Sequence, residues 1–414
     1  MKLLWLNAGL LLPLDKGGKL RTWHVMRHLA RRHEITYLSF EDPEVTESDR
    51  DGMSEVCREL VTVRRSDAEK GTLRFYAGAA RYVVDSLPYA VAKYRSATYR
   101  TRVDALLHAR RFDVIVCDFL PPAVNLSDDL PCPSVIFTHN VEAEIWRRHA
   151  ENAVNPIARR LLAQQWRRML RFEGSTLARF DRVLAVSDAD RRTFEQLYPG
   201  SLRAPVHVVR TGVDTSYFTA SREAPSHAHL VFTGSMDWLP NEDAMTYFCR
   251  DILPRIREAE PGVTVSIIGR SPTHAVQQLA NQFQGVEVTG RVDDVRPHVR
   301  RGDVYIVPLR IGGGTRLKIF EAMAMGKAIV STTVGAEGLP VTPGIDIAIA
   351  DDPQRFAEAV VRLIRDSGAR EALETRARKL VVERYDWSRV ALDFEDALER
   401  TSRNPHQPAQ RAIA

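Results

Sequence analysis

Short apolar runs alternate with longer mixed segments along almost the whole chain. In the first half the apolar runs occupy residues 2–8, 34–40, 112–119, 133–140 and 181–187. They are short and rich in Val, Ile, Leu and Phe, which predicts buried strands. The segments between them, such as residues 20–32, mix apolar and charged side chains and predict helices. Strands that alternate with helices in this way are typical of a parallel, doubly wound α/β sheet.

The second half of the chain repeats this pattern. Its predicted strands lie at residues 229–235, 263–269, 286–290, 303–309 and 327–333, with predicted helices over 242–258 and 274–283. The 414 residues are too many for one ordinary core. We therefore expect two doubly wound domains, over residues 1–205 and 206–385, with a cleft between them. A helix over residues 386–402 and a polar, disordered tail over 403–414 would follow.

The composition fits a cytoplasmic globular protein, with 44% hydrophobic and 27% charged residues. Four cysteines are scattered without metal-ligand spacing, which argues against a disulfide framework and fits a reducing compartment. The N-terminal stretch MKLLWLNAGLLLPLDKGG lacks a small-residue cleavage site. We therefore interpret it as a first strand and a loop, not as a signal peptide. No apolar run is long enough to span a bilayer.

The net charge of +5 is unevenly distributed. Residues 1–214 hold 33 basic and 27 acidic side chains, a balance of +6, whereas residues 215–414 hold 25 and 26, a balance of −1. The excess concentrates in residues 82–111 and in a second segment with seven arginines. These are Arg147, Arg148, Arg159, Arg160, Arg167, Arg168 and Arg171. Two interpretations stay open, solvated helix faces or peripheral contact with an anionic membrane surface. Nucleic acid is not expected as a partner, because no reader motif accompanies the charge.

The stretch IGGGTRLKIFEAMAMGKAIV, residues 311–330, has the most informative chemistry. A predicted strand precedes three glycines that can let a ligand approach the backbone. Thr315 can cap the following helix, whose unpaired N–H groups suit a phosphate. Arg316 and Lys318 add positive charge. The stretch is neither a Walker A loop nor GxGxxG, so it predicts either another kind of anion site or a turn that merely joins strand to helix.

Seven stretches, taken in order, resemble the GT-B fold glycosyltransferases of glycosyltransferase family 4. They are LDKGGKLRTWHVMRHLARRHEITYLSF, THNVEAE, FDRVLAVSDAD, TGVDTSYF, VFTGSMDWLPNEDAM, GGGTRLKIFEAMAMGKAIVSTTVGAEGL and ERYDWSRVALDFEDALE. The chain is most similar to bacterial exopolysaccharide-type sugar transferases. The resemblance implies a first Rossmann-like domain on the acceptor side, a second that binds the nucleotide-sugar, and a C-terminal helix that crosses back to the first.

The resemblance assigns the donor site to the second domain. The groups that would hold the diphosphate, and stabilise it as it leaves, belong to Gly312, Gly313, Gly314, Thr315, Arg316 and Lys318. Glu321 would hydrogen-bond the ribose hydroxyls, and its alternative is an interaction with the helix N-terminus. Arg291 and Val292 would line the base through their backbone, although Arg291 also fits a surface charge.

Three residues of the first domain are implied as well. Gly17 and Gly18 follow the first strand, and in the family such a pair lets the backbone approach the diphosphate or the transferred sugar. A tight turn without a ligand is the alternative. His139 closes a predicted strand at its carboxyl end, where ligands bind in doubly wound sheets. The resemblance implies that it contacts the donor sugar or the reacting centre, and the alternative is a structural histidine.

The chain departs from the family pattern in two places. Gly313 stands where the family often has the first of two glutamates, and GSMDWLPNED lacks the cations that often open the second domain. The aspartates of DAD, residues 188–190, look like a metal-binding pair. We interpret Ser187 and Asp190 instead as a capping pair at a helix start. A GT-B enzyme needs no metal, so we expect no metal site and no cofactor besides the nucleotide-sugar.

The predicted function is that of a retaining glycosyltransferase in polysaccharide biosynthesis. It would move a sugar from a UDP- or GDP-sugar to a hydroxyl of a glycan or lipid-linked acceptor. The alternative within enzymes is a nucleotide-sugar epimerase of the same double-domain architecture, and the alternative outside enzymes is a carbohydrate- or nucleotide-binding scaffold. The expected location is the cytoplasm, including a peripheral position on the inner face of the membrane.

Overall fold

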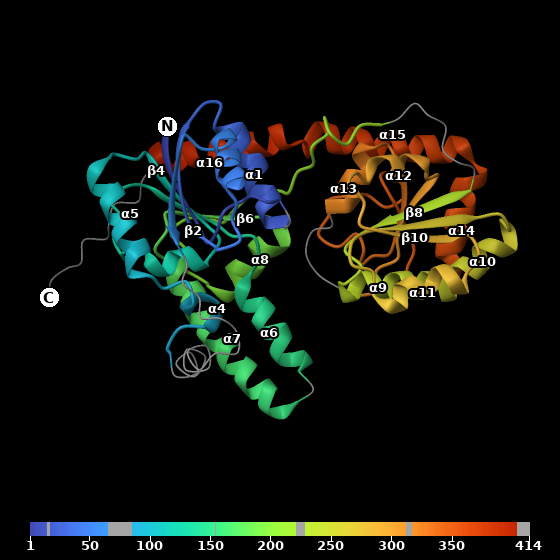
Figure 1. The fold of residues 1–414 in the computed structure, drawn as a ribbon, viewed down its shortest axis with the longest axis horizontal. Coiled ribbons are helices and arrows are strands. Elements are labelled where there is room, and N and C mark those ends of the chain that lie inside the picture. The colour runs from blue at the N-terminus through green and yellow to red at the C-terminus, as the bar shows by residue number, and fades with distance from the viewer. Residues whose placement is uncertain (15–16, 65–84, 154, 221–227, 312–316, 404–414) are drawn as a thin grey trace. The chain divides into compact units, whose positions relative to one another are not determined.

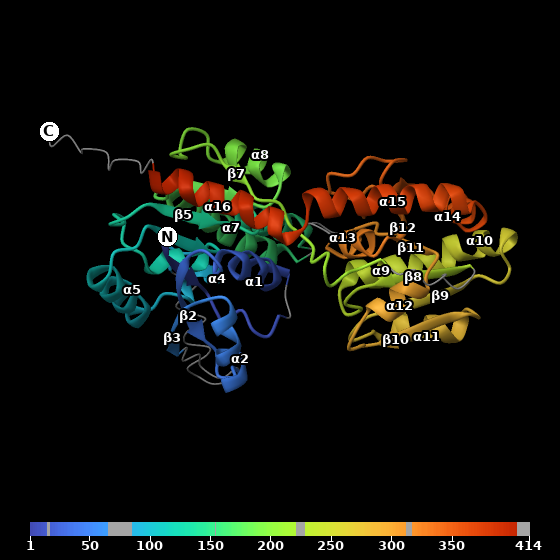
Figure 2. The same cartoon turned by 90° about the horizontal axis from the view of Figure 1, so that it is seen from above.

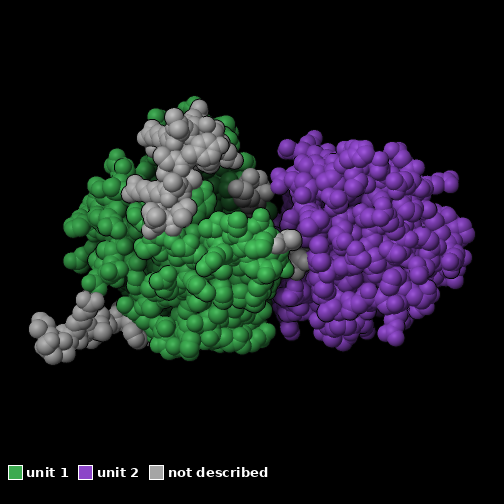
Figure 3. Space-filling view, turned by 90° about the horizontal axis from the view of Figure 1, so that it is seen from below, with its two compact units in different colours: residues 1–210, 390–414 green, residues 211–389 purple. Residues whose placement is uncertain are grey.

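The computed structural model describes residues 1–14, 17–64, 85–153, 155–220, 228–311 and 317–403. The chain divides into two compact units (Figure 3). Unit 1 comprises Met1–Arg210 and Val390–Ala414, and unit 2 comprises Thr211–Arg389. The boundary lies a few residues beyond the one expected from sequence. Each unit is a parallel sheet covered by helices on both faces (Figures 1 and 2).

Unit 1 contains a seven-stranded sheet in the order β3-β2-β1-β4-β5-β6-β7, and every pair is parallel. The strands are β1 (Lys2–Asn7), β2 (Glu34–Glu41), β3 (Glu59–Arg64), β4 (Val114–Asp118), β5 (Ser134–Phe137), β6 (Arg182–Ala185) and β7 (His207–Val208). The chain winds outward in one direction from β1 and in the other from β4. This order places the switch point of the doubly wound sheet between β1 and β4.

Helices and two short 3₁₀ turns connect the strands of unit 1. They are α1 (Gly17–Leu29), α2 (Glu47–Gly52), η1 (Met53–Glu55), α4 (Tyr89–Ala92), α5 (Ala97–Ala109), η2 (Pro121–Asn125), α6 (Glu142–Asn152), α7 (Pro156–Leu177) and α8 (Asp188–Leu197). Helices α6 and α7 pack side by side as a long hairpin (Figure 1).

The C-terminal helix α16 (Trp387–Arg403) begins in unit 2 and belongs to unit 1 from Val390 onward. Phe394 stacks on Trp5 of β1 with ring centroids 5.5 Å apart and packs edge-on against Phe137 of β5. Glu395, itself buried, forms an ion pair with Arg32 and accepts a hydrogen bond from His33 just after α1. The helix therefore covers one face of the unit 1 sheet. It includes residue 403, which the sequence placed in the tail; residues 404–414 lie outside the described residues.

Unit 2 contains a six-stranded parallel sheet in the order β10-β9-β8-β11-β12-β13. The strands are β8 (His229–Thr233), β9 (Thr264–Ile268), β10 (Val286–Gly290), β11 (Val304–Val307), β12 (Ala328–Ser331) and β13 (Ala348–Ile349). Here the switch point lies between β8 and β11. The core is built from the apolar side chains of these strands and of the helices on both faces.

The helices of unit 2 follow the predicted order with one change. They are α9 (Leu239–Tyr247), the π-helical turn η3 (Phe248–Ile252), α10 (Leu253–Ala259), α11 (His274–Gln282), α12 (Arg296–Arg301), α13 (Leu317–Ala324), α14 (Pro353–Arg365) and α15 (Ser367–Arg384). The single helix expected over residues 242–258 corresponds to a continuous helical run that the π-helical turn η3 divides into α9 and α10. Pro254, in the first turn of α10, has no N–H to donate, and the π-helical turn directly precedes it.

Candidate functional site

The first candidate site lies at the switch point of unit 1, where the carboxyl ends of β1 and β4 meet. Ligands of doubly wound sheets bind at such points, because the crossovers on either side leave the strands in opposite directions. Asn7 ends β1 and Asp118 ends β4. His139 follows β5, the next strand in the sheet. The sequence predicted this place for His139 but assigned no role to Asp118.

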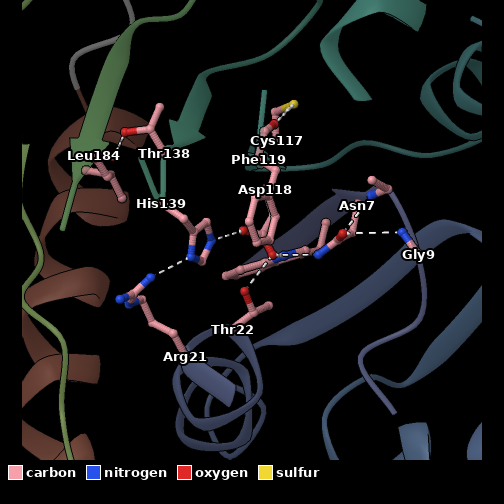
Figure 4. A network of polar contacts seen from close by, with 12 residues as sticks. Asn7, Gly9, Arg21, Thr22, Cys117, Asp118, Phe119, Thr138, His139 and Leu184 are labelled. Atoms are coloured by element: carbon pink, nitrogen blue, oxygen red, sulfur yellow. Dashed lines mark hydrogen bonds and ion pairs between the residues drawn. The ribbon is translucent and has the colours of Figure 1, made fainter. Parts of the chain in front are cut away.

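Asp118 is the centre of a buried hydrogen-bond network (Figure 4). Its Oδ2 accepts hydrogen bonds from Trp5 Nε1 at 3.1 Å, Asn7 Nδ2 at 2.7 Å and Thr22 Oγ1 at 2.7 Å. Its Oδ1 accepts one from His139 Nε2 at 2.7 Å. One carboxylate thus joins β1, α1, β4 and the end of β5. A buried carboxylate needs this many donors, since an unpaired charge in the interior is strongly unfavourable.

The partners of His139 determine its tautomer. Arg21 Nη1 lies 2.8 Å from Nδ1 of the ring, and a guanidinium can only donate. Nδ1 must therefore accept, and Nε2 carries the hydrogen that is donated to Asp118. The imidazole is neutral, in agreement with its burial, which lowers the pKa of His139 even though Asp118 acts in the opposite direction. The ring side chain is only 2% exposed.

The two glycines are the first residues of α1, not part of a loop before it. A Cβ atom on Gly18 would lie 2.5 Å from the Phe119 ring and 3.7 Å from His139 Nδ1. Phe119 in turn stacks on His139 at 3.8 Å between ring centroids. Gly18 is thus required for close packing of α1 on this pair of rings. Gly17 is exposed.

Two acidic residues of α8 have local partners. Ser187 caps α8, as expected, with its Oγ accepting from Asp190 N at 3.0 Å and donating to Asp190 Oδ2 at 2.7 Å. Asp188 pairs with Arg210 at 2.6 Å. Within the described residues, no group of three or more His, Cys, Asp or Glu side chains is arranged to hold a metal ion.

The second candidate site lies at the switch point of unit 2. Lys318 in the first turn of α13 donates to Thr233 O at the end of β8, at 3.0 Å, and to Asn241 Oδ1 at 2.9 Å. Its Nζ also lies 3.9 Å from the centroid of the Phe232 ring. Asn241 is buried and donates its amide to Ser235 O at 2.9 Å, which turns its oxygen toward the lysine. The predicted cation is therefore fixed between the carboxyl end of β8 and helix α9.

Glu321 lies one turn further along α13 and is partly buried. Among the residues that the structure describes, no hydrogen bond or ion pair involves its carboxylate. Burial raises its pKa to about 7, and the charge of Lys318 offsets this effect only in part. A desolvated carboxylate to which no described residue donates is available to accept hydrogen bonds from a ligand.

Two other predicted donor-site residues, Arg291 and Val292, follow a strand of the same sheet, and an arginine that was not predicted follows another. Arg291 follows β10, the edge strand, and its side chain is exposed; Val292 packs partly against the core. Arg310 follows β11 and pairs with Asp243 at 2.5 Å. Gly312, Gly313, Gly314, Thr315 and Arg316 lie outside the described residues. Their assignment to the diphosphate stays a prediction.

The arginine-rich segment forms the α6–α7 hairpin of unit 1 (Figure 1). Arg147 and Arg148 form ion pairs with Glu144 of the same helix. Arg168 is buried. The exposed arginines of α7 are Arg159, Arg160, Arg167 and Arg171, and exposed Ile157 and Leu161 lie beside them. No described helix is both long enough and apolar enough to cross a membrane.

Comparisons with known proteins agree with this architecture. A family model described as Glycosyltransferase Family 4 matches residues 16–217, and one described as Glycosyl transferases group 1 matches residues 227–366. A phosphatidyl-myo-inositol mannosyltransferase of Mycolicibacterium smegmatis is 29% identical over 229 residues, which is 53% of this chain and 57% of that protein. An uncharacterized 44.6 kDa protein in the cps region of Klebsiella pneumoniae is 21% identical over 40% of this chain and 44% of its own length. The chain thus spans about half the length of these two curated relatives.

Among solved structures, HepE of Anabaena in complex with UDP has a TM-score of 0.67 at 15% identity and covers 97% of this chain and 100% of its own. Sucrose-phosphate synthase from Thermosynechococcus elongatus has a TM-score of 0.64 at 14% identity, over 97% and 98% of the two chains. Two Rossmann-like units with such neighbours define the GT-B fold. Since the two models together match most of the chain, the protein is a glycosyltransferase of the group 1/family 4 type.

Sequence reasoning missed three residues of these sites. Asp118 was included in a predicted strand, and a charged residue at the carboxyl end of an apolar run is a signal that could have found it. Arg21 was indistinguishable from the other cations of its helix. Asn241 lay within GSMDWLPNED, which the sequence described only by its lack of cations. The structure shows that this stretch provides the residue that holds Lys318.

Proposed function

We propose that the protein is a retaining glycosyltransferase that moves a sugar from a UDP- or GDP-sugar to a hydroxyl of a glycan or lipid-linked acceptor in polysaccharide biosynthesis. The observation that carries the proposal is Glu321, a partly buried carboxylate at the switch point of unit 2 with a raised pKa. Hydroxyl groups of a ribose would supply the donors that no described residue gives this carboxylate. The neighbour HepE binds UDP and UDP-glucose, which supports a nucleotide-sugar donor here.

Lys318 would act on the diphosphate of the donor. Its ammonium is fixed at the carboxyl end of β8, and the same turn of α13 follows the predicted glycine-rich stretch. Negative charge grows on the diphosphate as the glycosidic bond breaks, so a fixed cation binds the transition state more tightly than the ground state. Arg316 and the amides of residues 312–315 would share this task, and Arg291 and Val292 would line the base. The reaction would need no metal ion.

The acceptor would be handled by unit 1, whose α7 offers a suitable surface for a lipid-linked substrate. Exposed arginines of α7 lie on the same helix as Ile157 and Leu161, which are 73% and 50% exposed. Glu173 is the acidic residue of this helix, and it is buried, where its carboxylate accepts from Glu142 N and Tyr198 Oη. A cationic surface with protruding aliphatic side chains suits a bilayer that contains anionic headgroups. The protein would thus act peripherally on the inner face of the membrane.

Turnover with a panel of nucleotide-sugars and glycan acceptors tests the proposal. A transferase releases free nucleoside diphosphate and extends the acceptor, and the anomeric configuration of the product shows whether it retains. An epimerase would give a new nucleotide-sugar without any acceptor, and a binding scaffold would give neither product. Unchanged turnover in EDTA is expected, whereas loss of turnover that Mg²⁺ or Mn²⁺ restores would contradict the metal-independent part of the proposal.

A further inference from the structure

We propose that Arg270 is a second cation of the donor site in unit 2, and that it binds the diphosphate of the nucleotide-sugar together with Lys318. The inference rests on the proposed function and deepens it, because it adds a substrate-binding residue that the sequence did not indicate. The stretch GSMDWLPNED has no cation. Positive charge at the end of β8 therefore has to come from other elements.

The first step concerns the place of Arg270 in the sheet. It lies two residues beyond the carboxyl end of β9, the strand that pairs with β8. Its main-chain carbonyl accepts a hydrogen bond from Met236 N at 2.9 Å. Gly269, directly before it, packs so closely that a Cβ atom there would overlap Gly234 O. The backbone thus fixes Arg270 against the loop between β8 and α9, at the carboxyl edge where doubly wound sheets bind their ligands.

The second step concerns the connection to Lys318, which runs through Ser235. The Ser235 hydroxyl oxygen accepts from Arg270 Nε at 2.9 Å, and its main-chain oxygen accepts from Asn241 Nδ2 at 2.9 Å. The Asn241 amide oxygen in turn accepts from Lys318 Nζ at 2.9 Å. An unbroken chain of hydrogen bonds therefore fixes two cations from distant parts of the sequence on one loop. Two fixed positive charges suit a ligand with two adjacent negative groups, and a diphosphate is such a ligand.

The third step concerns the guanidinium itself, which belongs to an exposed residue. In the part of the chain that the structure describes, no carboxylate forms an ion pair with Arg270, and Ser235 occupies only Nε. Arg310 after β11 differs, because two of its nitrogens donate to Asp243. Asp237 bears on the site through Ser235, whose hydroxyl donates to it at 2.6 Å and thereby turns its oxygen toward Arg270. The terminal nitrogens of Arg270 remain for two oxygens of a phosphate.

Calorimetry of Arg270→Ala with a series of nucleotides tests the inference most directly. Loss of hydrogen bonds between a guanidinium and a phosphate typically weakens binding by roughly 10- to 10²-fold. We expect a loss of this size for UDP or GDP, a smaller loss for UMP or GMP, and no change for the free nucleoside. Equal weakening for the diphosphate and the nucleoside would show that Arg270 does not act on phosphate, and unchanged affinity for the diphosphate would also overturn the inference.

Three further variants separate charge from position. Arg270→Lys keeps the charge but loses the planar fork and the bond to Ser235, so its loss should lie between those of Arg270→Ala and the wild type. Ser235→Ala leaves the guanidinium without its fixed partner and should weaken UDP binding less than Arg270→Ala does. Asp237→Asn keeps an acceptor for Ser235 and removes a negative charge beside the phosphate, so its affinity should not fall. A loss in Asp237→Asn as large as in Arg270→Ala would mean that only the shape of the loop matters.

The kinetics should separate donor from acceptor. Negative charge grows on the diphosphate as the glycosidic bond breaks, so Arg270→Ala should lower kcat and raise the donor KM. The acceptor KM should stay at the wild-type value. A raised acceptor KM with a normal donor KM would assign Arg270 to a phosphate of a lipid-linked acceptor and would overturn the inference.

Arg255→Ala is the matched control. Arg255 is also exposed and also donates to an uncharged oxygen, the main-chain carbonyl of Asp251, but it lies on α10, which leads to the amino end of β9. We expect wild-type affinity and kinetics. The Tm of Arg270→Ala should match the wild type, and a lower Tm with unchanged UDP affinity would show that Arg270 only stabilises its loop. A wild type that binds neither UDP nor GDP would refute the proposed function, whereas normal UDP binding and turnover in Arg270→Ala would refute this inference alone.

Discussion

The ammonium nitrogen of Lys318 lies 2.9 Å from the amide oxygen of Asn241. Asn241 is 3% exposed and is fixed from its other end by Ser235 O. Gly234 packs so closely that a Cβ atom there would lie 2.7 Å from the Asn241 amide nitrogen. The stretch GSMDWLPNED thus contains no cation of its own but binds the ammonium group of Lys318, which belongs to α13. The positive charge at the end of β8 therefore comes from a residue that is distant in the sequence.

We expect Asn241→Asp to reduce kcat more than nucleotide affinity. A carboxylate at this position would neutralise the ammonium that faces the departing diphosphate and would meet Ser235 O without a hydrogen to donate. Loss of an electrostatic donor typically costs about 2.7–4 kcal/mol, on the order of 10²–10³ in rate. Lys318→Ala removes the ammonium group and shows the largest loss of kcat to be expected. Asn281→Asp, on the exposed side of α11, is the control. Steady-state kinetics with wild-type kcat in both site variants would show that the diphosphate lies elsewhere.

The parallel, doubly wound class and most strands were predictable, because buried parallel strands are short apolar runs. β7 and β13 have two residues each, too few for any pattern to show, and β3 carries Glu59 and Arg64, which hide its apolar positions. The start of α1 at Gly17 was missed because glycines usually indicate a turn. Gly18, the next residue, is needed for the approach of α1 to Phe119.

The candidate sites were predictable only in part, since they depend on contacts between distant residues. Lys318 and Glu321 were found by motif, but Asn241 lies 77 residues before the lysine that it holds. His139 was found by its place after a strand. Its neutral tautomer follows from Asp118 and Arg21, which lie 21 and 118 residues away. No local pattern records that these three side chains meet.

The attachment of α16 to unit 1 should contribute strongly to stability. Phe394 is fully buried between Trp5 and Phe137. We expect Phe394→Ala to lower the free energy of unfolding by about 3–5 kcal/mol, the usual result of removing a buried aromatic ring. Leu392→Ala, at an exposed position of the same helix, should have little effect. Denaturant titrations compare the two, and equal destabilisation would contradict the packing role of Phe394.

Binding of the protein to vesicles should depend on both the charge and the aliphatic side chains of α7. We expect salt-sensitive binding to vesicles that contain anionic lipid and weak binding to neutral ones. Charge reversal at Arg160, Arg167 and Arg171 should abolish it, and Ile157→Ser with Leu161→Ser should weaken it. Arg147→Ala is the control, because Arg147 is paired with Glu144 and Glu151. Equal sedimentation with neutral and anionic vesicles would show that the arginines are only a solvated surface.

Nucleotide binding should be coupled to the ionisation of Glu321. Ribose hydroxyls donate to the ionised carboxylate, and burial raises the pKa of Glu321 to about 7. Binding near pH 7 should therefore release protons, and the nucleotide dissociation constant should rise as the pH falls below about 7. Calorimetry in two buffers of different ionisation enthalpy measures the release. Glu321→Ala should weaken binding by roughly 1.5–3 kcal/mol. Unchanged affinity and no proton release would contradict the ribose assignment.

The same carboxylate should make the free protein less stable at neutral and alkaline pH. Its pKa is about 7 in the folded chain, against an ordinary value of 4.5, so the folded state binds more protons than the unfolded state between these two values. The free energy of unfolding therefore falls as the pH rises through this window, and the full loss is present above it.

Glu321→Gln removes the titrating group and keeps the shape of the side chain. Its Tm should exceed that of the wild type at pH 8, and the difference should shrink toward pH 5. Glu358→Gln, at an exposed site on α14, should show no such dependence. If Glu321→Gln is more stable than the wild type at high pH but binds nucleotide no better, the desolvation of Glu321 serves ligand binding. Equal Tm values of the two proteins from pH 5 to pH 8 would mean that the carboxylate is already stabilised in the free protein.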